Sequence, residues 1–343
     1  MNLAILFGGA SYEHEISIVS AITLKEKLSA LELDFVFLDQ DHTFYYINAD
    51  KMNAKTFSTG AYKKEPVLKL EEGGFSQKTF LSSKHISFDN VLNLIHGADG
   101  EDATIASLFD FYNIDYIGPR KDASVMSFDK FMTKAYADAC EVDTVSYELL
   151  CGERKTSIAL PFIIKPTRLG SSIGVSIVKD ESELDYALDV AYEFDDKLLI
   201  EPFIEGVKEY NVAGCMTENG LKLSLVEEPQ KEEFLDFEKK YLDFSRSEQV
   251  HEADISDELK ASLYEAFEKI YKPLFEGALI RCDFFVVDGK VLLNEINPIP
   301  GSMANYLFDD FTALVKTITL PKRRDIKVNY NYLHEIRSAK GKA

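Results

Sequence analysis

Four polar residues with the chemistry of a metal and phosphate site interrupt an apolar stretch late in the chain. They are Arg281, Asp283, Glu295 and Asn297. A sheet core rejects such groups unless they find partners or ligands. Two carboxylates and an amide oxygen are hard ligands that suit Mg²⁺ carrying phosphates, and a guanidinium beside them can neutralise charge that develops during a reaction. A buried ion pair without a ligand explains one such residue more readily than all four.

The surrounding sequence predicts a β-hairpin that would gather these groups. Two runs rich in β-branched and aromatic residues, 279–287 and 291–296, flank the turn signal Asp288-Gly289. Side chains two residues apart leave the same face of a strand. A two-residue turn would set Asp283 opposite Asn294, so a shared face with Glu295 requires an odd number of loop residues. We therefore predict a three-residue or bulged loop.

A second chemical motif is a glycine and serine loop that follows a lysine. Lys165 ends an apolar strand, and Gly170, Ser171, Ser172 and Gly174 follow before the next strand. Backbone amides and hydroxyls in such a loop can cradle phosphate oxygens, and the lysine supplies a point charge. It is not a Walker loop, because no lysine follows the last glycine. A flexible hairpin tip would explain the glycines but not the lysine.

The N-terminal third predicts a parallel α/β domain whose strand ends carry polar residues. A strand over 2–7 runs into a glycine turn and a helix that begins near Glu13, and a buried strand over 91–95 ends at His96. Open α/β sheets bind ligands at such strand ends. On the residues alone, Glu13 is more readily explained as a favourable helix-dipole partner and His96 as a hydrogen-bonded structural residue than as functional groups.

Further along, the pattern predicts helices over 127–139, 181–192 and 256–271 and a strand over 198–209. The charged segment 227–253 has no clear periodicity, which indicates either disorder or a functional lid. A lid is favoured if the chemistry must exclude water.

Composition bounds the class of protein. A chain of 343 residues has room for two or three domains, and its net charge of −20 argues against nucleic acid or an anionic membrane as partner. No apolar run approaches the ~20 residues of a membrane span, and the start lacks the basic residues of a signal peptide, so we expect a cytoplasmic protein. We interpret the four cysteines, which have no metal-site spacing, as reduced packing residues.

The order of these motifs resembles the ATP-grasp fold and, more narrowly, the D-alanine:D-alanine ligase family, over nearly the whole chain. The motifs that carry it are LFGGASYEHEIS (6–17), HGADGED (96–102), FDK (128–130), IIKPTRLGSSIGVS (163–176), DFEKKY (236–241), RCDFF (281–285) and NEINPIPG (294–301). The resemblance implies an α/β (α+β) protein. Its N-terminal parallel α/β domain would cover 1–118, a central ATP-grasp subdomain 119–196, and a C-terminal subdomain with lid and metal hairpin 197–343.

The resemblance also implies a reaction for peptidoglycan precursor synthesis. ATP would phosphorylate the carboxylate of one D-alanine, and the amine of a second would attack the acyl phosphate. The implied requirements are ATP and two Mg²⁺ ions, which Mn²⁺ could replace. The implied partners are small molecules, with neither nucleic acid nor membrane, and because relatives are commonly dimers a homodimer is an open expectation.

The family's site roles map onto residues of this chain. Asp283, Glu295 and Asn297 would hold the metal ions. For ATP, the resemblance assigns Lys130 and Lys165 to the α and β phosphates, the amides of Ser171 and Ser172 to the β and γ groups, Glu201, Phe203 and Ile204 to adenine, Glu209 to the ribose, and Lys240 to the transferred phosphate.

Substrate roles follow in the same way. Glu13 would hold the ammonium of the first D-alanine, positioned through Ser171 and Tyr241. Arg281 and the Gly301 amide would stabilise the oxyanion, each donor contributing roughly 10²–10³ in rate. The resemblance adds His96 to the catalytic group, and it places Arg281, Gly301, Tyr306 and Leu307 around the second D-alanine.

Three features depart from the family's pattern. Members usually carry a small hydroxyl residue five positions beyond the Pro-Gly glycine, where this chain has Tyr306. Its phenol can donate the same bond from farther away. The interval from Ile204 to Glu209 is one residue longer than usual. The interval from Asp283 to Glu295 is one residue shorter than usual, and a hairpin loop with an odd number of residues would absorb this difference.

Other functions remain as alternatives. A ligase for a D-hydroxy acid such as D-lactate, or for D-serine, would share most motifs, although ester-forming relatives usually carry a histidine where this chain has Tyr241. Another ATP-grasp carboxylate–amine ligase is a further alternative. A nucleotide-binding regulatory protein without catalysis would not need the intact hairpin residues, and a dinucleotide oxidoreductase would need a glycine fingerprint that the first turn lacks.

Overall fold

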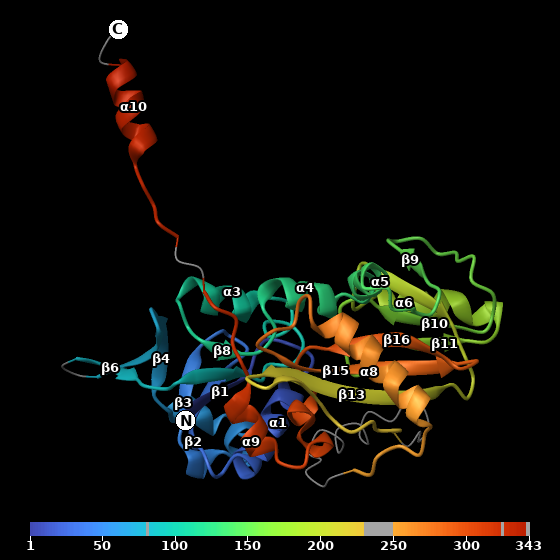
Figure 1. The fold of residues 1–343 in the computed structure, drawn as a ribbon, viewed down its shortest axis with the longest axis horizontal. Helices are drawn as coiled ribbons and strands as arrows, with labels where there is room; N and C mark the ends of the chain where they lie inside the picture. The colour runs from blue at the N-terminus through green and yellow to red at the C-terminus, as the bar shows by residue number, and fades with distance from the viewer. Residues whose placement is uncertain (80–81, 230–249, 324–325, 341–343) are drawn as a thin grey trace.

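The computed structural model describes residues 1–79, 82–229, 250–323 and 326–340, which form three β-sheets with helices around them (Figure 1). The first sheet has eight strands in the order β6-β5-β4-β3-β2-β1-β7-β8, and the other two have four each. Strands β2, β1, β7 and β8 are mutually parallel, and the remaining strands of that sheet are antiparallel.

The first sheet is built from β1 (Asn2–Gly8), β2 (Glu32–Leu38), β3 (Phe44–Ile47), β4 (Val67–Glu71), β5 (Gly74–Lys78), β6 (Ser83–Ile86), β7 (Asn90–Asn93) and β8 (Tyr116–Ile117). Its helices are α1 (His14–Lys27), α2 (Ala54–Ser58) and α3 (Thr104–Phe111), with short 3₁₀ helices at Ala49–Lys51 and Ala61–Lys64. The predicted strand–glycine–helix opening and the strand that leads to His96 are therefore confirmed.

Strand β1 shows why this sheet is covered on both faces. Its residues from Leu3 to Phe7 are all fully buried. Leu3, Ile5 and Phe7 belong to a core with α1, whereas Ala4 and Leu6 pack with α3 on the other side. Alternate side chains of a strand leave opposite faces, so a continuous apolar run suits a parallel strand between two helical layers.

The second sheet, in the order β11-β10-β12-β9, is antiparallel and carries the glycine and serine loop. It consists of β9 (Glu148–Leu150), β10 (Phe162–Pro166), β11 (Ser176–Val178) and β12 (Leu198–Pro202), covered by α6 (Leu184–Tyr192) after a 3₁₀ turn at Glu181–Glu183. The predicted pair of strands around the loop is confirmed. The single strand predicted over 198–209 is wrong, because the turn at Gly206, with a φ of 66°, separates β12 from β13.

The third sheet, in the order β14-β13-β15-β16, contains the predicted hairpin. It consists of β13 (Lys208–Thr217), β14 (Gly220–Leu223), β15 (Leu279–Val287) and β16 (Lys290–Asn297), and α8 (Asp257–Tyr271) packs on it. The helix predicted over 256–271 is confirmed, and Ser256 caps it by accepting a hydrogen bond from the Leu259 amide.

The hairpin turn itself differs from our expectation. Val287 pairs with Lys290, so the turn has two residues, Asp288 and Gly289, with φ angles of 50° and 77°. Such angles define a primed turn that matches the twist of the strands. The predicted odd residue is instead a bulge at Asn294, within β16, where the pairing register shifts.

The helix predicted over 127–139 is also divided. Helix α4 (Lys121–Phe128) ends before Asp129, and α5 (Lys130–Ala139) begins after it. The Asp129 carboxylate accepts hydrogen bonds from the amides of Phe131 and Met132 and caps α5. Apolar residues of both helices join the core of the third sheet. The division of the chain into domains 1–118, 119–196 and 197–343 stays a prediction.

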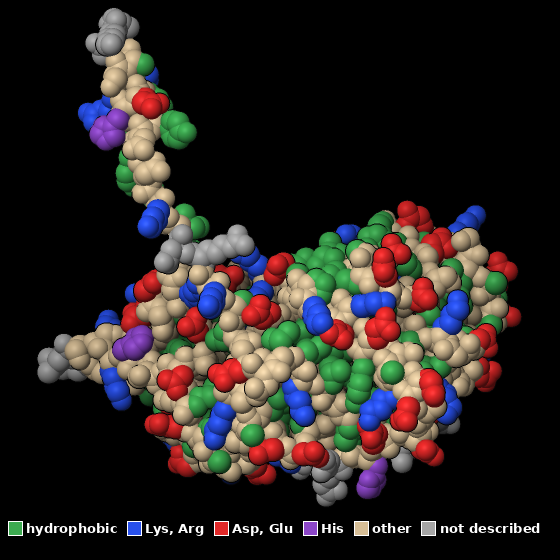
Figure 2. Space-filling model, in the orientation of Figure 1, with side chains coloured by type: hydrophobic (Ala, Val, Ile, Leu, Met, Phe, Trp, Pro, Cys, Tyr) green, Lys and Arg blue, Asp and Glu red, His purple; other side chains and the backbone are tan. Residues whose placement is uncertain are grey.

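The chain returns to the first sheet after the hairpin. The 3₁₀ segment Gly301–Leu307 and α9 (Phe311–Thr317) pack into the same core as α1. Helix α10 (Asn331–Lys340) then projects away from the body (Figure 1). Figure 2 shows hydrophobic side chains beside charged ones on this projecting segment, where six large apolar residues between 326 and 336 are more than half exposed.

All four cysteines are free thiols. Cys215 and Cys282 are buried in apolar clusters, as predicted, but Cys151 is exposed and does not pack. Within the ranges that the structure describes, every helix is too short or too polar to cross a bilayer.

The core of the third sheet offers a test of this packing. Phe267 on α8 is fully buried, so Phe267→Ala should lower the free energy of unfolding by about 3–5 kcal/mol through lost contacts and the cavity left behind. Chemical denaturation measures the change. Phe111→Ala is a matched control, because that ring is 77% exposed and its loss should cost about 0.5 kcal/mol or less. Equal effects of the two variants would contradict this core.

Candidate active site

The hairpin places its four polar groups on one face. Asp283 pairs with Glu295 and Arg281 with Asn297 across β15 and β16. Directly opposed residues of antiparallel strands project to the same side. Cys282 lies between the two pairs, points to the other side and is buried in the apolar core. The bulge at Asn294 thus achieves the alignment that we predicted from a different loop.

Arg281 and Asp283 form a bidentate ion pair. Arg281 Nε lies 2.7 Å from Asp283 Oδ1, and Nη2 lies 2.8 Å from Oδ2. Arg281 Nη1 also donates to the Tyr306 hydroxyl at 3.3 Å, and Asn297 Nδ2 donates to Asp283 Oδ2 at 3.0 Å. The guanidinium is therefore fixed between the hairpin and the segment that carries Tyr306.

Charge on this face favours a cation. Burial raises the pKa of Asp283 to about 7 although Arg281 opposes the shift, and the neighbouring Glu295 carboxylate raises it further. Two carboxylates thus lie close together on this face, and Arg281 pairs with Asp283. Asp283, Glu295 and Asn297 supply the hard oxygen atoms that Mg²⁺ prefers, so the donor set fits this ion. Within the described ranges no group of three His, Cys, Asp or Glu residues forms a metal site, and here the third donor is an amide.

Glu13 connects the first domain to the glycine and serine loop. It precedes α1, is buried, and accepts a hydrogen bond from Ser171 Oγ at 2.6 Å. A Cβ atom at Gly97 or Gly170 would lie 3.0 or 2.8 Å from the carboxylate oxygens. Glycine at both positions therefore makes room for this side chain. Burial raises the pKa of Glu13, while Ser171 and Lys130 oppose the shift.

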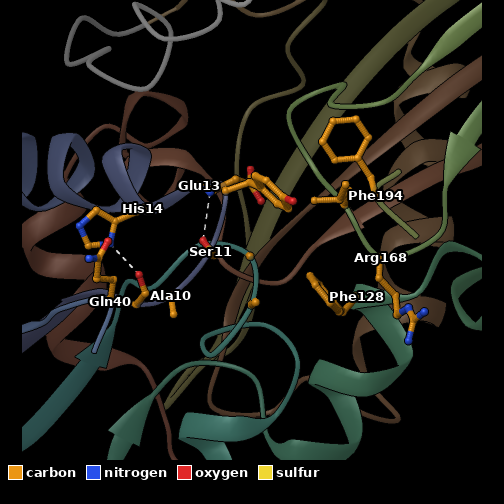
Figure 3. Close-up of a pocket in the computed structure, with 13 residues that line it drawn as sticks. Ala10, Ser11, Glu13, His14, Gln40, Phe128, Arg168 and Phe194 are labelled. Atoms are coloured by element: carbon orange, nitrogen blue, oxygen red, sulfur yellow. Dashed lines mark hydrogen bonds between the residues drawn. The ribbon is translucent and has the colours of Figure 1, made fainter. Parts of the chain in front are cut away.

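A cavity of about 590 Å³ lies beside Glu13. Figure 3 shows the start of α1 on one side of it, and Phe128, Arg168 and Phe194 on the other. The cavity thus lies between the first domain and the loop region of the second sheet, and a buried carboxylate forms part of its wall.

Two predicted phosphate-binding lysines lie close to these groups. Lys130 begins α5, and its ammonium donates to the Leu169 carbonyl beside the glycine and serine loop. Burial lowers the pKa of Lys130, and the nearby Lys165 ammonium lowers it further. The carboxylates of Glu295 and Glu13 oppose this shift. The Lys165 ammonium lies 2.6 Å from Glu201 Oε2 and donates to Asn294 Oδ1 at 3.3 Å. Lys130 is therefore close enough to Glu295 to feel its charge, and Lys165 contacts Asn294, so both lysines lie close to the hairpin.

His96 joins three segments of the site at their base. Its Nε2 lies 3.1 Å from Ser20 Oγ, which in turn accepts from the Ser302 amide at 3.1 Å. Burial lowers the pKa of His96 to about 4, against a hydrogen bond with the Ile299 backbone. A neutral imidazole here fixes the turn after Gly301 against α1.

Family models match both parts of the chain around this site. The model described as the D-ala D-ala ligase N-terminus matches residues 2–119, and that for the C-terminus matches residues 132–313. This chain belongs to the D-alanine–D-alanine ligase family. The mixed α/β architecture with its three sheets is the ATP-grasp ligase fold that the motifs predicted.

Individual members of the D-alanine–D-alanine ligase family match over the full length. The D-alanine–D-alanine ligases of Sulfurimonas denitrificans and a Sulfurovum species are 64% and 60% identical, each over 100% of both chains. A crystal structure of the ligase from Helicobacter pylori is 46% identical and superposes with a TM-score of 0.84, covering 94% of this chain and 100% of that one.

The remaining predicted residues lie around the same groups. Ser172 shares the loop turn with Ser171, and both have positive φ angles. Phe203 and Ile204 follow β12, Glu209 on β13 raises the pKa of Asp283, and Gly301 and Leu307 bound a buried 3₁₀ segment next to Tyr306. Lys240 and Tyr241 lie outside the described residues. The role of each residue stays a prediction.

Sequence reasoning missed two residues in this network. Lys134 forms a buried ion pair with Glu201, and Asn294 meets Lys165 from the bulge. A signal for Lys134 was present, because residues four apart on a helix share a face and Lys134 follows Lys130 by four. Asn294 had no such signal, because its orientation depends on where the bulge falls.

The buried imidazole predicts how stability depends on pH. An unfolded histidine has a pKa near 6.5. The unfolded state therefore binds a proton between about pH 6.5 and pH 4 that folded His96 does not, so stability falls as pH drops through this window, by up to about 3 kcal/mol. Denaturation of His96→Gln at several pH values should show a flatter profile than the parent.

The exposed His334 in α10 supplies the control for this experiment. His334→Gln should leave the pH profile unchanged. A profile for His96→Gln that parallels the parent from pH 6.5 to 4.5 would show that His96 is not buried in its neutral form.

Proposed function

We propose that this chain joins two molecules of D-alanine, the ligation that the names of its relatives give for those proteins, and that it couples this ligation to the cleavage of ATP to ADP and phosphate. The observation that carries the proposal is the single hairpin face on which Arg281 lies beside Asp283, Glu295 and Asn297. Lys130 shares the electrostatic environment of that face.

In the first step, a carboxylate oxygen of one D-alanine attacks the γ-phosphorus of ATP, and ADP leaves. Lys130 and Lys165 bind the α and β phosphates, and the amides at Ser171 and Ser172 cover the β and γ groups. Asp283, Glu295 and Asn297 would hold two Mg²⁺ ions, which when bound neutralise phosphate charge. The product is an acyl phosphate.

In the second step, the amine of the second D-alanine attacks the carbonyl carbon of the acyl phosphate. Arg281 and the Gly301 amide stabilise the oxyanion that forms, and the tetrahedral intermediate expels phosphate while the attacking nitrogen loses a proton. The Glu13 carboxylate binds the ammonium of the first D-alanine, and the hydrogen bond from Ser171 holds that carboxylate in place. Exclusion of water protects the acyl phosphate from hydrolysis.

The acceptor side is where this chain departs from the family's pattern. The Tyr306 phenol occupies the position of the usual small hydroxyl residue and already accepts a bond from Arg281. It would donate its own hydrogen to the carboxylate of the second substrate, next to Leu307. We further propose that the enzyme works in the cytoplasm, on small-molecule substrates, and as a homodimer.

An activity assay tests the main proposal. The purified chain with ATP, Mg²⁺ and D-alanine should release phosphate in a D-alanine-dependent manner and form D-alanyl-D-alanine, which mass spectrometry identifies. Competition between D-alanine, D-serine and D-lactate as acceptors decides between a dipeptide and a depsipeptide ligase. Phosphate release that does not respond to D-alanine would remove the proposal.

Tyr306→Phe tests the acceptor site separately. Loss of the phenolic hydroxyl removes a donor to the second carboxylate and a partner of Arg281. We expect kcat/KM for the second D-alanine to fall about tenfold, in line with one lost hydrogen bond to a charged group. The KM for ATP should change less than twofold. Tyr330→Phe in the exposed C-terminal segment is the matched control. An unchanged kcat/KM for the second D-alanine in Tyr306→Phe would exclude this role.

A further inference from the structure

A buried ionic triad links α5 to the metal hairpin through the second sheet. The Glu201 carboxylate on β12 pairs with two lysines at once. Its Oε2 lies 2.6 Å from Lys165 Nζ on β10, and its Oε1 pairs with Lys134 Nζ on α5. Lys165 extends the chain of contacts to Asn294 at the bulge. The triad thus connects three elements that meet at the nucleotide side of the site.

Burial decides which member of the triad can meet a ligand. The side chains of Lys134 and Glu201 are 1% and 2% exposed, whereas that of Lys165 is 14% exposed. Lys134 Nζ is further enclosed by the Val145 carbonyl at 3.4 Å and by the ring of Tyr147, whose centroid lies 5.6 Å away. Lys165 can therefore contact a bound anion, and Lys134 can act only through Glu201.

The charges of the triad do not balance. Two ammonium groups share one carboxylate, and a buried charge without a counter-charge is costly. Burial raises the pKa of Glu201, but the two lysines outweigh it and lower the pKa below its usual value. The carboxylate is therefore ionised and divided between them. Because Lys134 engages one of its oxygens, Glu201 neutralises Lys165 only in part, and the surplus charge attracts an anion.

We propose that Lys134 is a positioning residue for the nucleotide, which holds Glu201 so that the Lys165 ammonium keeps its charge directed at the polyphosphate. This inference rests on the proposed function, because it concerns the ATP subsite. Without the Lys134 ammonium, both oxygens of Glu201 would turn to Lys165, neutralise it and draw it away from the phosphates.

Lys134→Met tests the proposal with a side chain of similar length and no charge. We expect the Kd for ADP, measured by calorimetry, and the KM for ATP to rise at least tenfold, while the KM for D-alanine stays within twofold. Lys134→Arg should keep both nucleotide constants within threefold, because it restores the ion pair. Lys269→Met is the matched control, since that lysine is exposed on α8 and should change neither constant.

A double variant separates positioning from mere structural support. Lys134→Met is added to Glu201→Gln and compared with Glu201→Gln alone, so any lost contact between Glu201 and adenine is the same on both sides of the comparison. Because Lys134 acts only through the Glu201 carboxylate, its removal should then change the Kd for ADP less than threefold. A purely structural role predicts that the loss of tenfold or more persists in this background, and that result would overturn the proposal. If Lys134→Met alone does not fold, this comparison still tests the proposal, because the double variant keeps the net charge of the triad.

Failure of this inference can be told apart from failure of the proposed function. ADP binding needs no turnover, so a parent chain that binds ADP but makes no dipeptide would refute the proposed reaction and leave the Lys134 test readable. An active parent whose Lys134→Met variant has unchanged ADP affinity and an unchanged KM for ATP would refute the positioning role alone.

Discussion

The register of one β-hairpin is the constraint on which the rest of the site depends. A strand alternates its side chains between two faces, so a shift of one residue moves a whole set of groups to the opposite side. The bulge at Asn294 absorbs that one residue between the two-residue turn and Glu295. It leaves Cys282 in the apolar core and the side chains of Asp283, Glu295 and Asn297 on the other face. The same bulge aims the Asn294 side chain at Lys165, which ties the hairpin to the second sheet.

The site concentrates buried charge that a stable core would avoid. Asp283 is buried against Arg281 and close to a second carboxylate, that of Glu295. Glu13 is buried with a single serine hydroxyl as its hydrogen-bonding side-chain partner among the described residues, and Glu201 is divided between two lysines. Each arrangement is held by elements from different parts of the chain. Proteins depart from ordinary core chemistry mainly at functional sites, where the surrounding fold compensates for it. In the proposed reaction, the anionic nucleotide and its cations would complete the balance.

The sequence predicted local features well, because they depend on nearby residues. The hairpin, the strand before His96 and the helix that follows Ser256 agree with the side-chain alternation, turn residues and helical periodicity of the sequence. The break at Asp129 was missed, since an aspartate inside an apolar helical pattern can also be a surface residue. Its capping role appears only from the hydrogen bonds that it accepts.

Contacts between residues far apart in the sequence could not be predicted for the site. The resemblance assigned Lys165 and Glu201 to the nucleotide, but their direct pairing depends on the antiparallel contact between β10 and β12. Lys134 was missed for the same reason, because its partner lies 67 residues later in the chain. Spacing along one helix can indicate a shared face, but it does not show what that face meets.

The return of the chain to its first sheet has a consequence for biosynthesis. Met303, Leu307 and Phe311 pack into the core that also contains Leu3 and Leu24. Because proteins are synthesised from the N-terminus and domains tend to fold as they emerge, the first half of this chain leaves the ribosome with one flank of its sheet still uncovered. That flank is closed by residues that are translated much later, so a product truncated before Met303 would lack a complete N-terminal core as well as part of the proposed acceptor site.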